Sequence, residues 1–436
     1  MKCLINVLSG LKRKCIPHFV FSSSATVYGN PKTNLIYENF PIGRPFSPYG
    51  NTKKMNISLA NKIRARFQDT FETEPLMIFS PGRINIIGEH TDYNDGFVFP
   101  AAVNKGIIAA FGKRDSNDSM AYAVDKNEKV KFSLNSLKPL AKGSWKNYVI
   151  GVVAELKKRN KGISNFNIAF GGDIPGGAGI SSSAALENSV VFGLNELFDI
   201  KLSRQEMILI SQKAEHNYVG VKCGIMDQYA SMHGIENHAL LLDCRTVKSK
   251  PFKINFKEHT LILINTNVKH RLSDSAYNDR RSVCETIAGL LNVKALRDAS
   301  EFDLEAIKNK VTSENYQKAL YVIQENNRVI EASKAMETGN LELLGKLIYA
   351  SHEGLQHQYK VSCEELDFLV DQTKLNPQIL GARMMGGGFG GCTINLIART
   401  ETESFKTFIS KVYKKKFNTN CSIYNVSLSN GTRIIE

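Results

Sequence analysis

A stretch rich in glycine and serine, GGDIPGGAGISSSAALE, occupies residues 171–187. Because glycine accepts positive φ angles, successive backbone N–H groups of such a loop can converge on one anion. The serines that follow can cap a helix that begins near Ser183. The pattern therefore indicates a phosphate-binding loop at a helix N-terminus, although a loop of this composition can equally be a tight turn.

The glycine-rich loop brings no positive charge of its own. No lysine follows the glycines, as one does in a Walker-type loop, and no GxGxxG motif opens a strand-to-helix unit here. The charge that a bound phosphate requires must therefore come from elsewhere, either from Mg²⁺ or from a distant arginine.

Two further segments stand out by their composition. Residues 81–96 read PGRINIIGEHTDYNDG, a short apolar run that ends in Glu89, His90, Asp92 and Tyr93, and residues 383–393 read RMMGGGFGGCT. Taken alone, EHTDY fits a polar turn with a capping aspartate. Glycines that run into a strand can be there for close packing.

In this order and at these separations, the three segments resemble the three signature motifs of the GHMP kinases, and the first resembles that of the galactokinase family. The resemblance covers nearly all of residues 62–436. It implies an α+β fold with two lobes, mixed β-sheets flanked by helices and an active site between the lobes. The strings that extend it are QKAEHNYVGVKCGIMDQYASMHG (212–234), LLDCR (241–245), NTNVKHRLSDSAYNDRR (265–281) and VSCEELDFL (361–369).

The resemblance also implies roles for individual residues. Asp227 matches the family's base for the anomeric C1 hydroxyl, and Arg83 matches the arginine beside it, which can keep that carboxylate ionised and stabilise charge on the transferred phosphoryl group. Ser181 and Glu215 match positions around Mg²⁺. Without the resemblance, these four residues would be a structural ion pair, a helix cap and a helix-surface acid.

The remaining implied site residues fall into two groups. The sugar is expected to contact Glu89, His90, Asp92, Gly224 and Tyr277. The phosphates of ATP are expected to contact Gly176, Gly177, Ala178, Gly179, Ser181, Ser182 and Ser183. GGGFGG is expected to support the site instead of taking part in the chemistry. Asp173 departs from the family pattern, and its negative charge near the phosphates could weaken ATP binding.

The activity that the resemblance implies is Mg²⁺- and ATP-dependent phosphorylation of D-galactose at its C1 hydroxyl. Three alternatives stay open. A non-catalytic galactose sensor is disfavoured because ISSSAALE, Arg83 and Asp227 are all present. A sister kinase for N-acetylgalactosamine or arabinose would differ only in outer pocket residues. A bifunctional epimerase-kinase would bind NAD.

Residues 1–61 resemble a different family. FVFSSSATVYGNP and SPYGNTKKMN are similar to a central piece of UDP-glucose 4-epimerase, and Ser24, Tyr49 and Lys53 fall on that family's catalytic positions. No GxGxxG precedes Ser24, and no sugar-nucleotide domain follows Lys53, so epimerase activity is not expected. We therefore predict three segments, a truncated epimerase-like fragment (1–61), an N-terminal kinase lobe (62–212) and a C-terminal kinase lobe (213–436).

Periodicity predicts the elements around these motifs. Apolar residues recur every four positions from Met55 to Phe71 and predict one helix across the change in composition near residue 62. HEGLQH spaces its histidines five apart, not four, and is predicted to be a helix surface instead of a metal site. The other predictions are strands over residues 97–103, 238–244, 260–265 and 392–397, and helices over 276–291 and 315–336.

Composition limits the class of protein. The net charge is +14, but residues 1–61 contribute +7 of it (eight Lys or Arg against one Glu), so a nucleic-acid partner is not expected. No apolar window is long enough for a membrane span. The eight cysteines form no CxxC pair and are expected to be reduced thiols. We therefore expect a cytoplasmic monomer whose partners are a small sugar and ATP.

Overall fold

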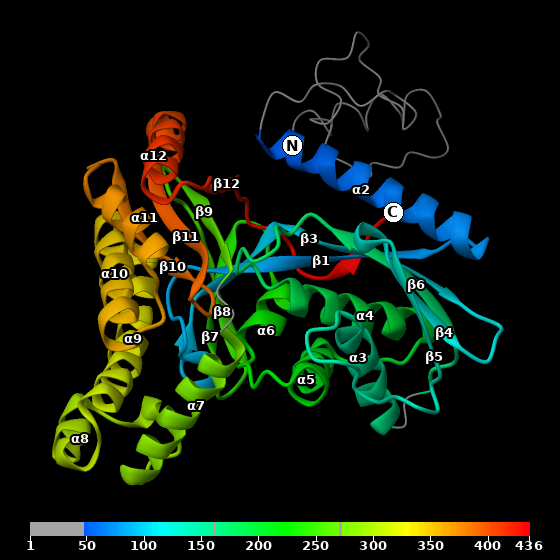
Figure 1. Cartoon of the computed structure of the whole chain (residues 1–436), viewed down its shortest axis with the longest axis horizontal. Helices are drawn as coiled ribbons and strands as arrows, with labels where there is room; N and C mark the ends of the chain where they lie inside the picture. Colours follow the sequence, from blue (N-terminus) through cyan, green and yellow to red (C-terminus); the bar gives the residue numbers. More distant parts are fainter. Residues whose placement is uncertain (1–47, 160–161, 270–272) are drawn as a thin grey trace, which may run out of the picture. The chain divides into compact units, whose positions relative to one another are not determined.

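The computed structural model of the chain describes residues 48–159, 162–269 and 273–436 (Figure 1). Residues 59–435 form one compact unit. The epimerase-like residue Ser24 lies outside the described residues, as do the side chains of Tyr49 and Lys53. The nature of the N-terminal fragment therefore stays a prediction.

The N-terminal half of the compact unit is built on a six-stranded sheet with the order β13-β1-β3-β6-β4-β5. Neighbouring strands pair antiparallel, except for β4 and β6, which pair parallel. The last strand of the chain thus lies at the edge beside the first, with Ile434 opposite Ile78. The strands are β1 (Leu76–Asn85), β3 (Pro100–Lys113), β4 (Ser119–Ala123), β5 (Glu128–Phe132), β6 (Phe166–Gly172) and β13 (Arg433–Ile434).

Helix α2 (Pro48–Phe71) runs across the change in composition, so the predicted continuous helix is confirmed. Its side chains Ile63 and Phe67 are fully buried and pack in one cluster with Met77 and Ile108 of the sheet. The four-residue spacing puts these apolar side chains on one side of the helix, which covers one face of the six-stranded sheet.

Four helices cover the other face of the six-stranded sheet (Figure 1). Gly193 lets its helix, Ser182–Phe198, approach the sheet closely, because a Cβ at this position would lie 2.3 Å from the Phe111 ring. The glycine-rich loop of residues 176–181 leads directly into the same helix. The four are α3 (Lys146–Lys158), α4 (Ser182–Phe198), α5 (Arg204–Ala214) and α6 (Met226–His233).

The C-terminal half contains an antiparallel four-stranded sheet with the order β10-β11-β9-β12. Successive residues of its strand β9 point to opposite faces. Leu261 and Leu263 pack with α9 and α10, while Ile262 and Ile264 pack with α11 and α12. The elements are β9 (His259–Lys269), β10 (Ile379–Met385), β11 (Gly390–Ala398), β12 (Ser422–Asn425), α9 (Ser313–Thr338), α10 (Leu341–Glu353), α11 (Glu364–Lys374) and α12 (Thr402–Phe417).

A small three-stranded sheet corrects one strand prediction. Its strands are β2 (Phe97–Val98), β7 (His238–Asp243) and β8 (Lys248–Lys253). The single strand predicted over residues 97–103 is wrong, because β2 belongs to this sheet and β3 to the six-stranded one. The break falls at Phe99, whose backbone N–H donates to the carbonyl of Ile87 and whose carbonyl accepts from Ile86, at 3.1 and 3.0 Å.

The other predicted elements are confirmed, with ends that differ by a few residues. They are β7, β9, β11 and α9 as given above, and α7 (Ser273–Leu290), which is followed by the short α8 (Glu301–Ala306). One mixed sheet, two antiparallel sheets and the helices that flank them confirm the α+β prediction. The predicted lobe boundary after residue 212 falls inside α5, and this division of the chain stays a prediction.

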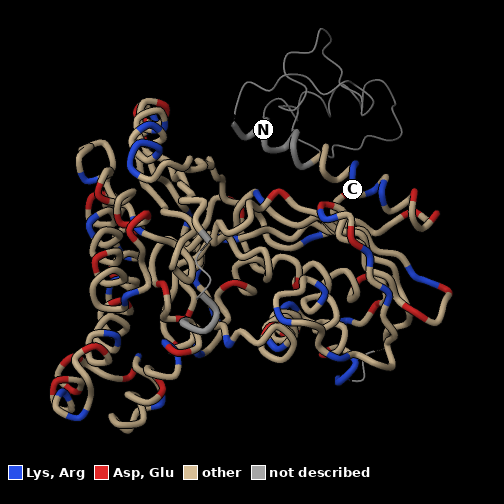
Figure 2. Tube along the Cα trace, in the orientation of Figure 1, with Lys and Arg blue, Asp and Glu red and all other residues tan. Residues whose placement is uncertain are grey.

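Charged residues of both signs are interspersed along the outer helices (Figure 2). This distribution is typical of a solvated surface and differs from the one-sided basic patch of a nucleic-acid-binding protein. Among the helices that the structure describes, none combines the length and the apolar character needed to cross a bilayer.

Candidate active site

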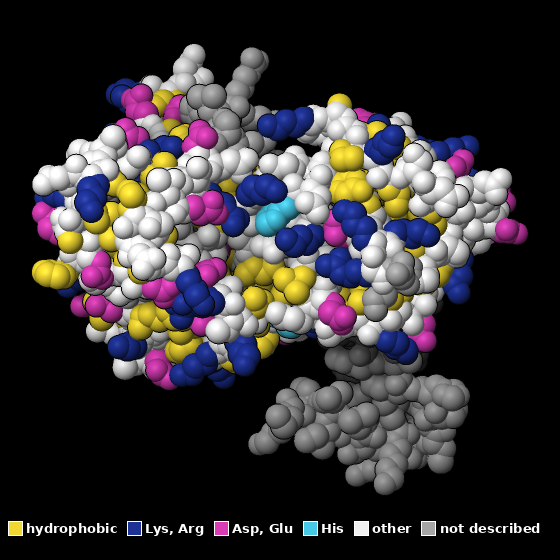
Figure 3. Space-filling model, turned by 90° about the horizontal axis from the view of Figure 1, so that it is seen from below, with side chains coloured by type: hydrophobic (Ala, Val, Ile, Leu, Met, Phe, Trp, Pro, Cys, Tyr) yellow, Lys and Arg dark blue, Asp and Glu magenta, His cyan; other side chains and the backbone are white. Residues whose placement is uncertain are grey.

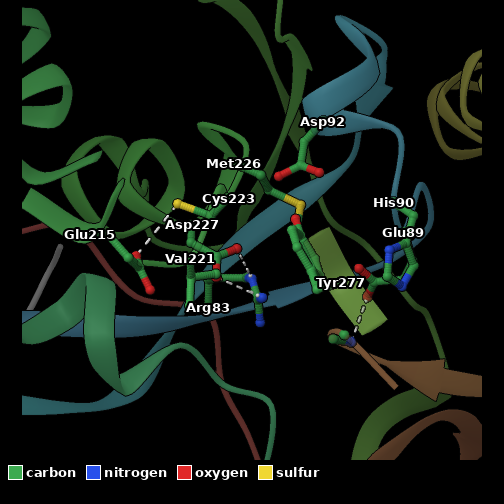
Figure 4. A pocket seen from close by; sticks show the side chains of 12 residues that line it. Arg83, Glu89, His90, Asp92, Glu215, Val221, Cys223, Met226, Asp227 and Tyr277 are labelled. Carbon is green, nitrogen blue, oxygen red and sulfur yellow. Dashed lines mark hydrogen bonds and ion pairs between the residues drawn. The ribbon is translucent and has the colours of Figure 1, made fainter. Parts of the chain in front are cut away.

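A cavity of about 190 Å³ lies where β1, the loop after β1, α6, α7 and the end of β10 meet (Figure 4). It brings together residues of the first and third signature motifs and therefore of both halves of the unit. Its lining residues are Arg83, Glu89, His90, Asp92, Glu215, Val221, Cys223, Met226, Asp227, Tyr277, Gly386 and Gly387.

At one end of the pocket Arg83 and Asp227 form a bidentate ion pair. Arg83 Nε lies 2.7 Å from Asp227 Oδ1, and Nη2 lies 3.0 Å from Oδ2. Burial alone would lower the pKa of Arg83, but the nearby carboxylates Asp227 and Glu89 outweigh it and raise that pKa. The guanidinium also donates to the carbonyl of Gly179, so the pair touches the glycine-rich loop directly.

Ser181 joins this pair and does not cap the helix. Its hydroxyl donates to Asp227 Oδ2, and it makes no capping hydrogen bond to α4. The alternative interpretation of Ser181 as a helix cap is therefore wrong. The reason is conformational, because a capping residue normally has an extended backbone, whereas Ser181 has φ +56° and its hydroxyl bonds Asp227.

The glycine-rich loop presents its backbone to open space. Gly176 and Gly177 are exposed, and a Cβ on either would meet no atom within 4 Å. Gly177 and Gly179 have φ +71° and +68°, which favour glycine. A Cβ on Gly179 would lie 3.1 Å from the carbonyl of Met385, so the loop packs closely against the third motif.

The unexpected Asp173 is neutralised within the protein. Its carboxylate lies 3.4 Å from Lys105 Nζ and accepts a 2.8 Å hydrogen bond from the backbone of Gly106. Both charged side chains are about 15% exposed. The negative charge is therefore compensated before it can act on the loop that follows.

At the other end of the pocket Glu89 is held by a fully buried arginine. Glu89 Oε1 accepts from Arg383 Nη1 at 3.1 Å and from the backbone of Gly386 at 2.9 Å. Arg383 also donates to the carbonyl of Ile86 at 3.0 Å. Sequence reasoning did not single out Arg383, although its place directly before the glycines of the third motif was the available signal.

Burial shifts the pKa values of Asp92 and His90, the two neighbours of Glu89 in the pocket, in opposite directions. It raises the pKa of Asp92 to about 7, with a further contribution from the negative charge of Asp227. It lowers the pKa of His90 to about 3, helped by the positive charge of Arg280. At neutral pH His90 is therefore a neutral imidazole, which can donate one hydrogen bond and accept another.

Gly224 and Tyr277 shape the same end of the pocket. A Cβ on Gly224 would lie 2.1 Å from Asp92 Oδ2, so only glycine leaves room for that carboxylate. The Tyr277 ring lies 5.6 Å from the His90 ring and 4.9 Å from the Tyr93 ring. These predicted residues are thus brought together, although their roles stay predictions.

Glu215 lies beside the ion pair on a π-helical turn, Glu215–Val219. Burial and the charge of Asp227 raise its pKa to about 7, while hydrogen bonds from Cys223, Ser183 and Gln228 oppose the shift. The serine that bonds Glu215 is therefore Ser183, whereas Ser181 bonds Asp227. Among the described residues no cluster of three His, Cys, Asp or Glu is arranged to hold a metal.

Basic side chains lie outside the pocket, close to this turn. Burial lowers the pKa of the half-buried His216, and the charges of Lys222, Arg281 and Lys213 lower it further. Figure 3 shows several basic side chains close together near the middle of one face of the molecule. Such a cluster is suited to an anionic substrate.

HEGLQH is only partly a helix surface. His357 is exposed, as predicted, but His352 is fully buried and its Nδ1 accepts a 3.2 Å hydrogen bond from the backbone of Met384. The prediction is therefore wrong for His352. His352 lies in α10, whereas His357 lies in the π-helical turn Gly354–Gln358 that follows it.

Comparisons with known proteins identify the family of this pocket. Residues 65–113 match the galactokinase galactose-binding signature, residues 147–235 the GHMP kinase N-terminal domain and residues 332–415 the GHMP kinase C-terminal domain. Over 360 residues the chain is 38% identical to a galactokinase of Thermotoga petrophila. This match covers 83% of this chain and 100% of that protein. The chain belongs to the galactokinase family of the GHMP kinases.

Other members support this assignment. A galactokinase of Glaesserella parasuis is 39% identical over 363 residues, covering 82% of this chain and 94% of that protein. The crystal structure of Lactococcus lactis galactokinase complexed with galactose matches with a TM-score of 0.82 and 33% identity, over 86% of this chain and 99% of that chain. As a member of the galactokinase family, the protein is a sugar kinase that transfers a phosphoryl group.

Proposed function

We propose that this galactokinase-family protein transfers the γ-phosphoryl group of ATP to the C1 hydroxyl of D-galactose. The observation that carries the proposal is the bidentate pair of Arg83 and Asp227 at one end of a pocket whose other end holds Glu89, His90 and Asp92. One cavity thus offers hydrogen-bonding groups for a polyol and, beside them, a paired carboxylate for proton transfer.

Asp227 is the proposed base. It accepts the proton of the C1 hydroxyl while the C1 oxygen bonds to the γ-phosphorus. The bond from that phosphorus to its bridging oxygen breaks, and ADP leaves with the electron pair. Arg83 orients both carboxylate oxygens and, through its contact with Gly179, lies beside the loop proposed to hold the phosphates. From there it can stabilise charge on the transferred group.

The proposed ATP phosphate site is the glycine-rich loop of residues 176–183, where Gly176, Gly177 and Ser182 are exposed. Mg²⁺ is the proposed cofactor, and Ser181 and Glu215 would hold it. Ser183 is part of the same proposed site because its hydroxyl bonds Glu215. Hydroxyl and carboxylate oxygens fit a hard cation. When bound, Mg²⁺ would neutralise charge on the phosphates.

The sugar is proposed to bind between Glu89, His90 and Asp92, with Tyr277 and Gly224 shaping the pocket. The carboxylates would accept hydrogen bonds from sugar hydroxyls. A non-catalytic galactose sensor has less support, since such a protein does not require the assembled pair of Arg83 and Asp227.

The deciding experiment measures ADP release by the purified full-length protein with Mg·ATP. D-galactose, N-acetylgalactosamine, L-arabinose and no sugar are compared. We expect release that depends on D-galactose. Turnover with another sugar alone would identify a sister kinase, and folded protein without turnover on any sugar would favour the sensor. Retained NAD or conversion of UDP-sugars would instead favour the bifunctional alternative.

We also propose that the protein acts as a cytoplasmic monomer whose partners are the sugar and ATP. The six described cysteines, among them the buried Cys244, Cys284 and Cys392, are free thiols, which suits a reducing compartment. Light scattering during size-exclusion chromatography tests the oligomeric state, and a mass of twice 48.5 kDa would contradict it.

A further inference from the structure

A chain of buried hydrogen-bonding groups leads from His90 away from the pocket. His90 Nδ1 lies 2.8 Å from the Tyr93 hydroxyl, which in turn lies 2.8 Å from the Tyr359 hydroxyl. The Cys284 thiol lies 3.4 Å from the Tyr359 hydroxyl. All four side chains are at most 8% exposed, so water competes little for these bonds.

The other ring nitrogen of His90 is available to a ligand. Among the described residues Nε2 has no hydrogen-bond partner of normal geometry, although it is buried and the backbone of Gly387 lies close enough to affect the ring. His90 lines the pocket next to Glu89 (Figure 4). Since buried polar atoms are normally paired, this nitrogen is suited to bind a substrate oxygen.

The acid and base strengths of these side chains decide which group donates in each hydrogen bond. A phenol O–H is a stronger donor than a neutral imidazole N–H, and an imidazole lone pair is a stronger acceptor than a phenol oxygen. The favoured order has Tyr359 donating to Tyr93, and Tyr93 donating to His90 Nδ1. The Cys284 thiol completes the order by donating to Tyr359. Each bond polarises the next, which strengthens the last one.

Because Nδ1 accepts, the single proton of the neutral ring must be on Nε2. We propose that Tyr93 and Tyr359 are positioning residues that hold His90 as its Nε2–H tautomer, so that it donates a hydrogen bond to a substrate oxygen. This inference deepens the proposed sugar kinase function and rests on it.

The tautomer restricts which substrates fit. Glu89 and Asp92 present carboxyl groups at the same end of the pocket, and an ionised carboxylate only accepts hydrogen bonds. Above the pKa of Asp92, which is about 7, both are acceptors and His90 is the donor among these three residues. A substrate must therefore offer an acceptor atom to His90, which a hydroxyl does and a protonated amine does not. A sugar in which an ammonium group replaces the hydroxyl that contacts His90 is therefore expected not to bind.

The charge around His90 is consistent with one ring proton. Burial and the nearby Arg280 lower the pKa of His90 to about 3, while the Gly387 backbone opposes this shift. A second proton, which would make both nitrogens donors irrespective of Tyr93, is therefore disfavoured at neutral pH.

The test is ¹⁵N NMR of the full-length protein labelled at histidine, with His90→Gln to assign the signals. The wild type is expected to show Nε2 protonated and Nδ1 unprotonated. Tyr93→Phe should lose this fixed pattern and raise the KM for galactose about tenfold, with less than about a twofold change in the KM for ATP. Tyr359→Phe should raise the KM for galactose about threefold, because it acts through Tyr93.

Tyr413→Phe is the matched control. This buried tyrosine also donates one hydrogen bond, to the carbonyl of Thr266 at 2.8 Å, but it does not line the pocket. Neither KM should change. A wild-type proton on Nδ1, or a Tyr93→Phe variant with wild-type tautomer and KM, would overturn the proposal. The spectrum does not depend on turnover, so failure of the proposed kinase reaction would be seen separately.

Discussion

The two ends of the pocket treat the same kind of side chain differently. Asp227 has Arg83 on both carboxylate oxygens and the Ser181 hydroxyl on one of them. Asp92 forms no ion pair among the described residues, and burial raises its pKa to about 7. The comparison shows that the protein pairs the proposed base with a cation and, within the described part of the chain, leaves Asp92 without one. We expect the hydroxyl groups of the substrate to compensate the charge of Asp92.

The largest expected effect is at the transfer end. Asp227→Asn keeps the shape of the side chain but removes the proton acceptor, so kcat should fall by about 10³-fold or more. ATP affinity should stay within about threefold of the wild type, because a base contributes mainly to the transition state. Steady-state kinetics and nucleotide titration measure both quantities. Asp199→Asn, on an exposed side chain, is the control, and undiminished turnover by Asp227→Asn would exclude the assigned role.

Arg383 tests the framework of the sugar end. Arg383→Met leaves Glu89 as a buried charge without its cation, so the free energy of unfolding should fall by about 3 kcal/mol. Adding Glu89→Gln should recover part of this loss, because the unpaired charge is then gone. Chemical denaturation without ligand measures both variants. The exposed Arg399→Met is the control, and a double variant less stable than Arg383→Met would contradict the explanation.

Asp92→Asn should weaken sugar binding without affecting ATP. It removes a charged acceptor for substrate hydroxyls, and hydrogen bonds to charged groups contribute about 1.5–3 kcal/mol. The KM for galactose should therefore rise about 30-fold, with an unchanged KM for ATP. An equal rise in both KM values would mean that the variant damages the whole pocket, and not the sugar end alone.

The same variant should change how stability depends on pH. With a folded pKa of about 7 against the usual 3.8, Asp92 stabilises the wild type fully below about pH 4, and this contribution is lost as pH rises through 7. Asp92→Asn lacks this dependence, so its stability relative to the wild type should rise by about 1–2 kcal/mol between pH 6 and 8. Unfolding of the ligand-free proteins across this range measures it, and a difference that falls with pH would refute the assignment.

The smallest expected effect is at Asp173. Because Lys105 and the backbone of Gly106 already compensate its charge, Asp173→Asn should change the KM for ATP by less than about twofold. Gly176→Asp introduces a charge in the exposed loop without such partners and should raise that KM by about tenfold. Similar effects of the two substitutions would mean that Lys105 does not compensate Asp173.

Much of the fold could be predicted because its signals are local. The four-residue spacing that ends at Phe71 predicted α2, and apolar runs predicted β9 and β11. The errors occurred where a distant partner decided the local structure. The backbone of Phe99 pairs with residues 86 and 87, and this pairing divides the strand predicted over residues 97–103. The Ser181 hydroxyl donates to Asp227 and therefore does not cap its helix.

The candidate site shows the same division between local and distant information. The resemblance to the family named Arg83, Asp227 and the sugar-end residues, whereas the residue types alone left a structural ion pair and a polar turn open. Nothing local indicated that Arg383 holds Glu89, since the two are 294 positions apart. The same holds for Tyr359 and Tyr93, which are 266 positions apart.

The sequence by itself thus determined the family, the main elements and the groups available for chemistry. Only the tertiary structure decided which group stabilises which. A side chain's charge and its hydrogen-bonding atoms are covalent properties, but its burial and its partners depend on how distant strands and helices pack. That is why two aspartates of identical chemistry differ in one pocket: Asp227 is paired with an arginine, whereas Asp92 is buried and its pKa is raised.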